Sequence, residues 1–319
     1  MTFPLPFAFL LKSYSHDFEL AKRMVASFNE FNHEGIHLFV VVPESDMSLF
    51  SEFESEQISL ISENRFSEHL VDTEVHDLRP GYINQEIIKL AFWELNLAQN
   101  YFCVDSDAEF IRPFSVNDFM FDSQTPYSVL VQDLELAVEP QYYSQYWKNR
   151  EVEIGRIAQL MELDTRVVLT CHGHTVFSAQ VLQSFVTDFL SPRHWDYRDA
   201  LAYSPYEFSW YNLWLQKTHP EKIHPREPWI KVFHHEGQYL DYLAHQVTVE
   251  DLARGYLGVV INSSFARELP NTPQAGAGSD NGGSRTSKGA SLAQHLSYGE
   301  LGTLIAAKIK RTARNKFHH

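Results

Sequence analysis

The sequence contains few cysteines and no long apolar run. Only Cys103 and Cys171 occur among 319 residues, and they lack the CxxC spacing, which argues against a disulfide scaffold. No apolar run approaches the roughly 20 residues that a membrane-spanning helix needs. The first residues, MTFPLPFAFLL, lack the basic region and the cleavage site of a signal peptide. The sequence therefore predicts a cytoplasmic protein with buried free thiols.

Basic residues are also scarce. The chain has 26 Lys and Arg against 41 Asp and Glu, giving a formal net charge of −15. This balance excludes a general affinity for nucleic acid. The exception is the C-terminal end, where Lys308, Lys310, Arg311, Arg314 and Lys316 face only Glu300 after Tyr298.

The composition predicts three parts. Residues 1–264 have the apolar content of one globular domain. Residues 265–295 are rich in Gly, Ser, Asn and Thr, as in a flexible linker. Residues 296–319 are predicted to form a basic amphipathic helix. Such a helix favours peripheral binding to the anionic inner face of the cytoplasmic membrane. The alternative is a helix that packs on the acidic domain or on a partner.

The first third of the chain alternates between strand and helix patterns. We expect strands within residues 7–11, 36–46, 51–62 and 100–107, and helices within residues 12–31, 51–62 and 81–97. This alternation predicts a Rossmann-like α/β fold, with a mostly parallel sheet flanked by helices. Ligands of such sheets bind beyond the carboxyl ends of the strands.

The second half is less regular. Residues 128–136 and 166–179 resemble strands, residues 178–190 and 206–217 resemble helices, and residues 229–233 resemble a late strand.

Two carboxylates close the fourth predicted strand. The segment NYFCVDSDAEF places Asp105 and Asp107 on either side of Ser106. On a straight strand the two side chains point the same way. Mg²⁺ and Mn²⁺ prefer carboxylate oxygens and retain positions for phosphate or water. The pair therefore predicts a site for a divalent metal and a diphosphate.

This arrangement resembles the D-x-D strand of nucleotide-sugar glycosyltransferases of the GT-A fold, in particular a bacterial group of envelope-polysaccharide glycosyltransferase-like proteins. The resemblance covers roughly residues 7 to 245. It includes FLLKSYSHDFELAKRMVASF, LFVVVPESD, GYINQEIIKL, HGHTVF and SPYEFSWYNLW, in that order.

The resemblance implies a set of donor-binding residues. Asp107 would ligate the Mn²⁺ or Mg²⁺ that bridges the donor diphosphate, and Asp105 would contact the metal through water, or the ribose. Ser106 would lie between them. The loop after the first strand would surround the nucleoside of a UDP-sugar with Ser13, Tyr14 and Asp17. Asp17 is equally suited to begin a helix.

Gln85 and Lys89 are four residues apart and share one helix face. Lys89 is a candidate to offset diphosphate charge, and a solvated helix face is the alternative.

Two histidine pairs are candidates for substrate or metal. If residues 166–179 form a strand, His172 and His174 face the same side, where the resemblance favours binding of acceptor hydroxyls; structural histidines or metal ligands are the alternatives. His234 and His235 end the last predicted strand. The resemblance implies that one of them is a third metal ligand, and the sequence leaves open which.

Glu207 begins an aromatic helix, where burial would raise the pKa of a catalytic base. Asp133 and Glu135 compete for the same role, and a helix-start acid is the structural alternative.

Together these features predict a metal-dependent glycosyltransferase. It would transfer sugar from a nucleotide-sugar to a glycan or lipid-linked acceptor in cell-envelope polysaccharide (lipopolysaccharide) synthesis. A non-catalytic nucleotide- or sugar-binding protein is the main alternative. A haloacid-dehalogenase-type hydrolase fits poorly. The D-x-D motif of those enzymes lies near the N-terminus, whereas here it lies at Asp105 and Asp107.

Overall fold

The computed structural model describes residues 3–75, 77–132, 134–138, 140, 143–164, 166–170, 173–234 and 236–261. The chain divides into two compact units. The first comprises Met1–Lys231 and Gly255–Val260, and the second comprises Val232–Arg254 and Ile261–His319. The predicted linker at residues 265–295 and the predicted helix at residues 296–319 lie outside the described residues.

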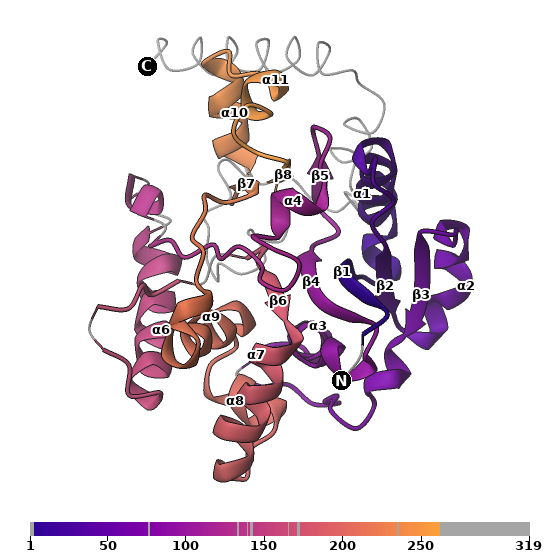
Figure 1. Ribbon diagram of the computed structural model, residues 1–319. Helices are drawn as coiled ribbons and strands as arrows, with labels where there is room; N and C mark the ends of the chain where they lie inside the picture. Colours follow the sequence, from indigo (N-terminus) through magenta and orange to yellow (C-terminus); the bar gives the residue numbers. More distant parts are fainter. Residues whose placement is uncertain are drawn as a thin grey trace, which may run out of the picture. The chain divides into compact units, whose positions relative to one another are not determined.

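A five-stranded sheet forms the centre of the first unit (Figure 1). Its order is β3 (Ile58–Ser62), β2 (Leu38–Val42), β1 (Leu5–Lys12), β4 (Ala98–Val104) and β6 (Val176–Ser178). The first four strands are parallel, and β6 is antiparallel to β4. The predicted α/β class with a mostly parallel sheet is confirmed.

The strand order changes direction at β1. The chain passes from β1 to β2 and β3 on one side and then returns to place β4 on the other side. Neighbouring connections therefore diverge beyond the carboxyl ends of β1 and β4, and this is where open α/β sheets bind ligands.

Two long helices pack their apolar faces on this sheet, whose central strands β1, β2 and β4 are buried along most of their length. Helix α1 (Phe18–Phe31) buries Ala21, Met24, Val25 and Phe28, and the Phe28 ring contacts Phe9 of β1. Helix α3 (Pro80–Ala91) lies on the side of Tyr101, whose hydroxyl donates to the Lys89 carbonyl at 2.7 Å. Alternation along β4 directs Tyr101, Cys103 and Asp105 toward α3.

Aromatic rings form the core on the α1 side of the sheet. Phe9 is fully buried. Its centroid lies 5.1–5.7 Å from the rings of Phe7, Phe28, Phe102, Phe110, Phe114 and Phe119. Such edge and tilted contacts add to the free energy gained by burying apolar surface.

The second half of the first unit is largely helical. Its elements are α4 (Val116–Phe119), η6 (Leu134–Val138), η7 (Tyr143–Trp147), α6 (Lys148–Leu160), α7 (Ala179–Ser184), η8 (Phe185–Leu190), η9 (Ser191–Arg193), α8 (Tyr197–Tyr203), α9 (Glu207–Thr218) and η10 (Pro220–Lys222). The helices predicted within residues 178–190 and 206–217 are present.

One strand prediction is wrong and another is confirmed in part. The described part of residues 128–136 has an isolated bridge at Ser128 and the start of the 3₁₀ helix η6, whereas residues 166–179 contain the short strand Val176–Ser178. Some of the β-branched and apolar residues in these segments make their backbone hydrogen bonds to side chains instead of to a neighbouring strand. One example is Val168, whose N–H and carbonyl pair with the Gln216 amide.

The remaining elements are short. They are η1 (Ser15–Asp17), η2 (Glu44–Asp46), α2 (Met47–Phe50), η3 (Ser51–Phe53), η4 (Glu63–Phe66) and η5 (Phe92–Leu95). A second sheet has the order β5 (Ala108–Phe110), β8 (Gly258–Ile261) and β7 (Ile230–Phe233). In the second unit, α10 (Glu236–Ala244) precedes α11 (Val249–Leu252). No helix among the described residues is long and apolar enough to cross a membrane.

Candidate functional site

The two carboxylates lie on a tight turn rather than on a strand. Strand β4 ends at Val104, and the Ala108 N–H donates to the Asp105 carbonyl at 3.1 Å. The straight-strand geometry expected for Asp105 and Asp107 is therefore wrong, because the turn changes the direction of the chain between them. Both remain at the carboxyl end of β4, beside the end of β1.

A pair of serines connects the ends of these two strands. The Ser106 hydroxyl donates to the Ser13 hydroxyl at 2.9 Å, and both side chains are buried. The structure thus brings the predicted residues Ser13, Asp105, Ser106 and Asp107 together at the point where the strand order changes direction.

A buried lysine organises the charges around Asp105. The Lys89 ammonium lies 3.0 Å from Glu207 Oε1, 3.3 Å from Asp105 Oδ1 and 3.5 Å from Glu86 Oε2. It also lies 4.8 Å from the centroid of the Phe208 ring. Lys89, Glu86 and Glu207 are each at most 5% exposed, so water screens these interactions little.

The pKa values follow from this geometry. Burial alone would lower the pKa of Lys89, but Asp105, Glu207 and Glu86 together raise it well above its ordinary value. Burial, followed by the nearby Glu207, raises the pKa of Glu86 well above its ordinary value. Burial would also raise the pKa of Asp105, but Lys89 and His174 hold it below its ordinary value. Lys89 is therefore charged and Asp105 ionised.

Asp107 is in the opposite situation. Burial, followed by repulsion from Asp105, raises its pKa from an ordinary value of 3.8 to about 7. No Lys, Arg or His among the described residues lies within ion-pair distance of its carboxylate. A half-buried carboxylate without a cationic partner among the described residues, next to a second ionised acid, is a suitable oxygen ligand for Mn²⁺ or Mg²⁺.

His174 is close to the same site but not on a strand. Its φ of 57° is in the left-handed region, which corrects the expectation that it alternates with His172. Its Nε2 lies 3.6 Å from Asp105 Oδ2, so Asp105 lies between Lys89 and His174. His172 is outside the described residues.

The predicted nucleoside-binding residues follow β1. Tyr14 is 39% exposed, and its ring stacks on His16 with centroids 6.0 Å apart. Asp17 occupies the N-cap position of α1 without a side-chain capping bond. The sequence reasoning missed Lys12, which is buried and lies 3.3 Å from Glu63. It also missed Asp46, which accepts a hydrogen bond from the Ser15 N–H at 2.6 Å.

The site of Glu86 and Glu207 shows another omission. Gln85 is half-buried and forms no hydrogen bond with Lys89, whereas Glu86 makes the i,i+3 contact with it. The sequence does indicate this contact, because Glu86 lies three residues before Lys89 in an apolar helix. Glu207 is at the helix start, as expected, but it holds Lys89; its role as a base stays a prediction.

Several other predicted residues are not brought to this site by the described structure. Asp133 and His235 lie outside the described residues, and so does the side chain of Glu135. His234 belongs to the second unit, where its N–H donates to Gln238 Oε1 at 2.6 Å. Whether either histidine ligates a metal stays a prediction.

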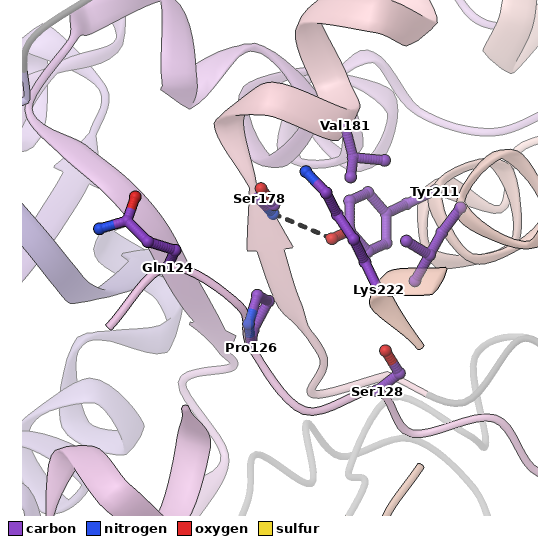
Figure 2. Close-up of a pocket in the computed structure, with 8 residues that line it drawn as sticks. Gln124, Pro126, Ser128, Ser178, Val181, Tyr211 and Lys222 are labelled. Carbon is purple, nitrogen blue, oxygen red and sulfur yellow. Dashed lines mark hydrogen bonds between the residues drawn. The ribbon is translucent and has the colours of Figure 1, made fainter. Parts of the chain in front are cut away.

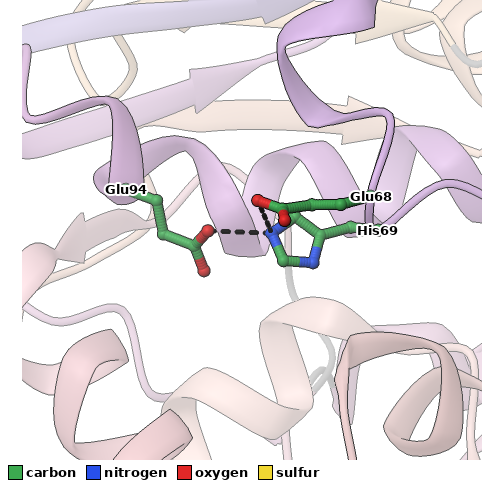
Figure 3. Close-up of side chains that lie close together, drawn as sticks. All are labelled: Glu68, His69 and Glu94. Carbon is green, nitrogen blue, oxygen red and sulfur yellow. Dashed lines mark hydrogen bonds and ion pairs between the residues drawn. The ribbon is translucent and has the colours of Figure 1, made fainter.

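A separate cluster contains Glu68, His69 and Glu94 (Figure 3). Among the described residues it is the group of three potential ligands whose atoms lie within 4.8 Å of one another. His69 Nε2 is 2.8 Å from Glu94 Oε2, and Tyr197 donates to Glu94 Oε1 at 2.7 Å. The bond to Glu94 raises the pKa of His69. These contacts connect η5 to α8 and account for the cluster without an ion.

A profile for a family described as "Family of unknown function (DUF6492)" matches residues 5–239. The chain belongs to this family. The match spans the five-stranded sheet and every site residue of the first unit named above. No curated protein matches the sequence.

Two solved structures are similar to this DUF6492 member. Mouse xyloside xylosyltransferase 1, in its apo form, is 10% identical with a TM-score of 0.45, over 81% of this chain and 98% of that chain. The apo structure of the bifunctional glycosyltransferase WbbM is 10% identical with a TM-score of 0.43, over 82% of this chain and 46% of that chain.

Replacing Lys89 should destabilise the fold strongly. Lys89→Met leaves Glu207, Asp105 and Glu86 near one another without their shared ammonium group. We expect a loss of about 3–5 kcal/mol in the free energy of unfolding near neutral pH, measured by urea denaturation. Lys22→Met removes an exposed pair with Glu52 and should cost less than about 1 kcal/mol. Equal losses in the two variants would contradict the assigned role of Lys89.

Replacing Asp107 should stabilise the metal-free protein. Its folded pKa of about 7 exceeds its ordinary value of 3.8, so its ionisation progressively lowers the free energy of unfolding as pH rises from 3.8 to about 7. Asp107→Asn removes this cost. The Tm difference from wild type, measured in EDTA, should therefore grow across that window and level off above it.

Asp122 provides a control of opposite sign. Backbone N–H groups of Gln124 and Thr125 lower its pKa, so Asp122→Asn should lower Tm. This loss should appear only at pH values above the pKa range of a free carboxyl group. A Tm difference for Asp107→Asn that does not vary with pH would contradict the raised pKa.

Proposed function

We propose that this protein is a metal-dependent glycosyltransferase that acts on a nucleotide-sugar, with a UDP-sugar favoured. The observation that carries the proposal is the position of Asp107: a half-buried carboxylate that pairs with no Lys, Arg or His among the described residues, at the carboxyl end of β4, where the sheet order changes direction. Open α/β sheets bind nucleotides at this point. A GT-A organisation of the first unit is part of the same proposal.

The chemistry needs charge neutralisation at the leaving diphosphate. A divalent cation held by Asp107 would supply a Lewis acid for the phosphate oxygens when bound. Asp105 is oriented from both sides by Lys89 and His174, so its carboxylate is held ready to accept a hydrogen bond from a ribose hydroxyl. Tyr14 offers an exposed ring on which a base can stack.

The remaining groups have supporting roles. Glu207 and Glu86 hold Lys89 in place, and Lys89 in turn holds Asp105. Ser13 and Ser106 fix the ends of β1 and β4 relative to each other. Gln85 and His174 are proposed to contact donor and acceptor, respectively. The acceptor is proposed to be a glycan or a lipid-linked glycan of the cell envelope.

One observation favours a second candidate, a nucleotide- or sugar-binding protein without catalysis. Glu207 is 5% exposed and accepts a hydrogen bond from Lys89, so in this conformation it does not reach an acceptor hydroxyl. A binding protein on the same fold needs Asp107 but needs no base.

Nucleotide binding should depend on Mn²⁺ and on Asp107. At a ligand concentration about 100 times Kd, UDP with Mn²⁺ stabilises the protein by about 2.7 kcal/mol, which corresponds to a rise in Tm of about 5 °C. A thermal-shift screen of nucleoside diphosphates with and without Mn²⁺ measures this rise. Asp107→Asn should abolish it. The proposal is wrong if no nucleotide raises Tm, or if Asp107→Asn responds like wild type.

Turnover separates the two candidates on the same samples. Release of UDP from a UDP-sugar, with and without glycan acceptors, should require Mn²⁺ and fall in Glu207→Gln. Nucleotide binding without turnover for any acceptor identifies the binding protein.

The basic C-terminal segment is proposed to attach the enzyme to an anionic membrane, where lipid-linked acceptors are found. Each Lys or Arg near such a surface contributes about 1 kcal/mol. The full chain should co-sediment with vesicles that contain phosphatidylglycerol but not with phosphatidylcholine vesicles. A chain ending at Arg267 should remain in the supernatant in both cases. Equal sedimentation of the two chains would rule out this attachment.

A further inference from the structure

A small pocket lies away from the carboxylates, among α9, β6 and a hairpin (Figure 2). Two backbone hydrogen bonds close the hairpin. The Tyr127 N–H donates to the Phe119 carbonyl at 2.9 Å, and the Phe121 N–H donates to the Thr125 carbonyl at 2.9 Å. The pocket is lined by Gln124, Pro126, Ser128, Ser178, Val181, Tyr211, Leu215 and Lys222.

Three hydroxyls at this pocket have unused hydrogen-bonding capacity among the described residues. Tyr211 is 2% exposed, and its oxygen accepts from the Ser178 N–H at 3.0 Å, but its own proton has no acceptor. Ser178 begins α7 without a side-chain capping bond. Ser128 is 4% exposed, and only its backbone is hydrogen-bonded. These hydroxyls border the pocket, so they are available to a polar ligand there.

An exposed aromatic ring is part of the same hairpin. Phe121 is 51% exposed, and one face stacks on His224 with centroids 3.6 Å apart and planes 7° apart. The His224 carbonyl accepts from the Ser128 N–H at 2.9 Å, which connects this ring pair to the pocket wall. A flat exposed aromatic surface beside a small polar pocket is suited to a ligand with one apolar face and several hydroxyls.

The polar lining of the pocket is mostly neutral. Lys222 is the one charged lining residue, and its ammonium donates to Gln180 Oε1; the other polar lining groups are hydroxyls and the Gln124 amide. The Gln99 amide donates to Gln124 Oε1 at 2.7 Å, which leaves the Gln124 N–H groups for a ligand. Neutral donors and acceptors next to an aromatic ring favour a sugar.

The position of the pocket separates it from the metal site. Ser178 pairs with Asn100 of β4, five residues before Asp105 in the sequence. At about 3.3 Å per residue along a strand, the two sites are about 16 Å apart along β4. A bound chain of several sugars therefore has room to contact the pocket without contacting Asp107.

We infer that this pocket and the Phe121–His224 pair form a binding subsite for a neutral glycan, with Phe121 against a sugar ring and the pocket hydroxyls around a sugar hydroxyl. The subsite goes beyond the proposed function, because glycan binding can be measured without nucleotide, metal or turnover.

Saturation-transfer NMR on the full chain tests the inference. The probes are maltohexaose, cellohexaose and mannohexaose, each at millimolar concentration, and inorganic phosphate serves as a competitor. We expect at least one hexasaccharide to receive saturation. Phe121→Ala and Gln124→Ala should each weaken its binding about tenfold, as expected for loss of a central contact. Ser178→Ala, which keeps the backbone bond to Tyr211, should also weaken it.

Leu49→Ala is the matched control, because Leu49 is 43% exposed on α2 and outside the subsite. It should bind the hexasaccharide like wild type. The inference is overturned if no hexasaccharide receives saturation, if Phe121→Ala and Gln124→Ala bind like wild type, or if phosphate displaces the sugar. The UDP-dependent Tm rise of the same variants reports on the metal site separately, so failure of one proposal does not resemble failure of the other.

Discussion

The site depends on one buried ammonium group shared by three carboxylates. Lys89 of α3 contacts Glu86 in its own helix, Glu207 of α9 and Asp105 at the end of β4. These elements are far apart in sequence, and removal of a buried cation is costly because the remaining charges stay desolvated. The Lys89 cluster therefore fixes where α3 and α9 lie relative to the end of β4, and it holds Asp105 ionised and oriented.

Asp107 has no such partner among the described residues, so the two acids differ in their electrostatic surroundings. Two acids one residue apart have opposite environments: Lys89 and His174 hold the pKa of Asp105 low, whereas burial and Asp105 itself raise that of Asp107 to about 7. Neighbouring acids with separated pKa values are typical of functional sites. The fold bears an electrostatic cost at Asp107 that a bound cation would relieve.

The sequence was sufficient for the parallel sheet, α1, α3, α9 and the placement of Asp105 and Asp107 at a strand end. Long apolar runs and clear helical periodicity carry that information. The sequence was not sufficient for residues 128–136 or for the extent of the strand in residues 166–179, where Val168, for example, pairs with the Gln216 side chain and not with a strand. It also did not reveal the contact between Lys89 and Glu207, because partners 118 residues apart are brought together only by the tertiary fold.

The most direct test of the central claim is the anomalous scattering of manganese in crystals soaked with MnCl₂ and UDP. The account predicts an anomalous peak about 2.0–2.2 Å from an Asp107 carboxylate oxygen, in contact with the diphosphate. A peak at Glu68, His69 and Glu94 instead, or UDP bound with the Asp107 side chain turned into solvent, would contradict it.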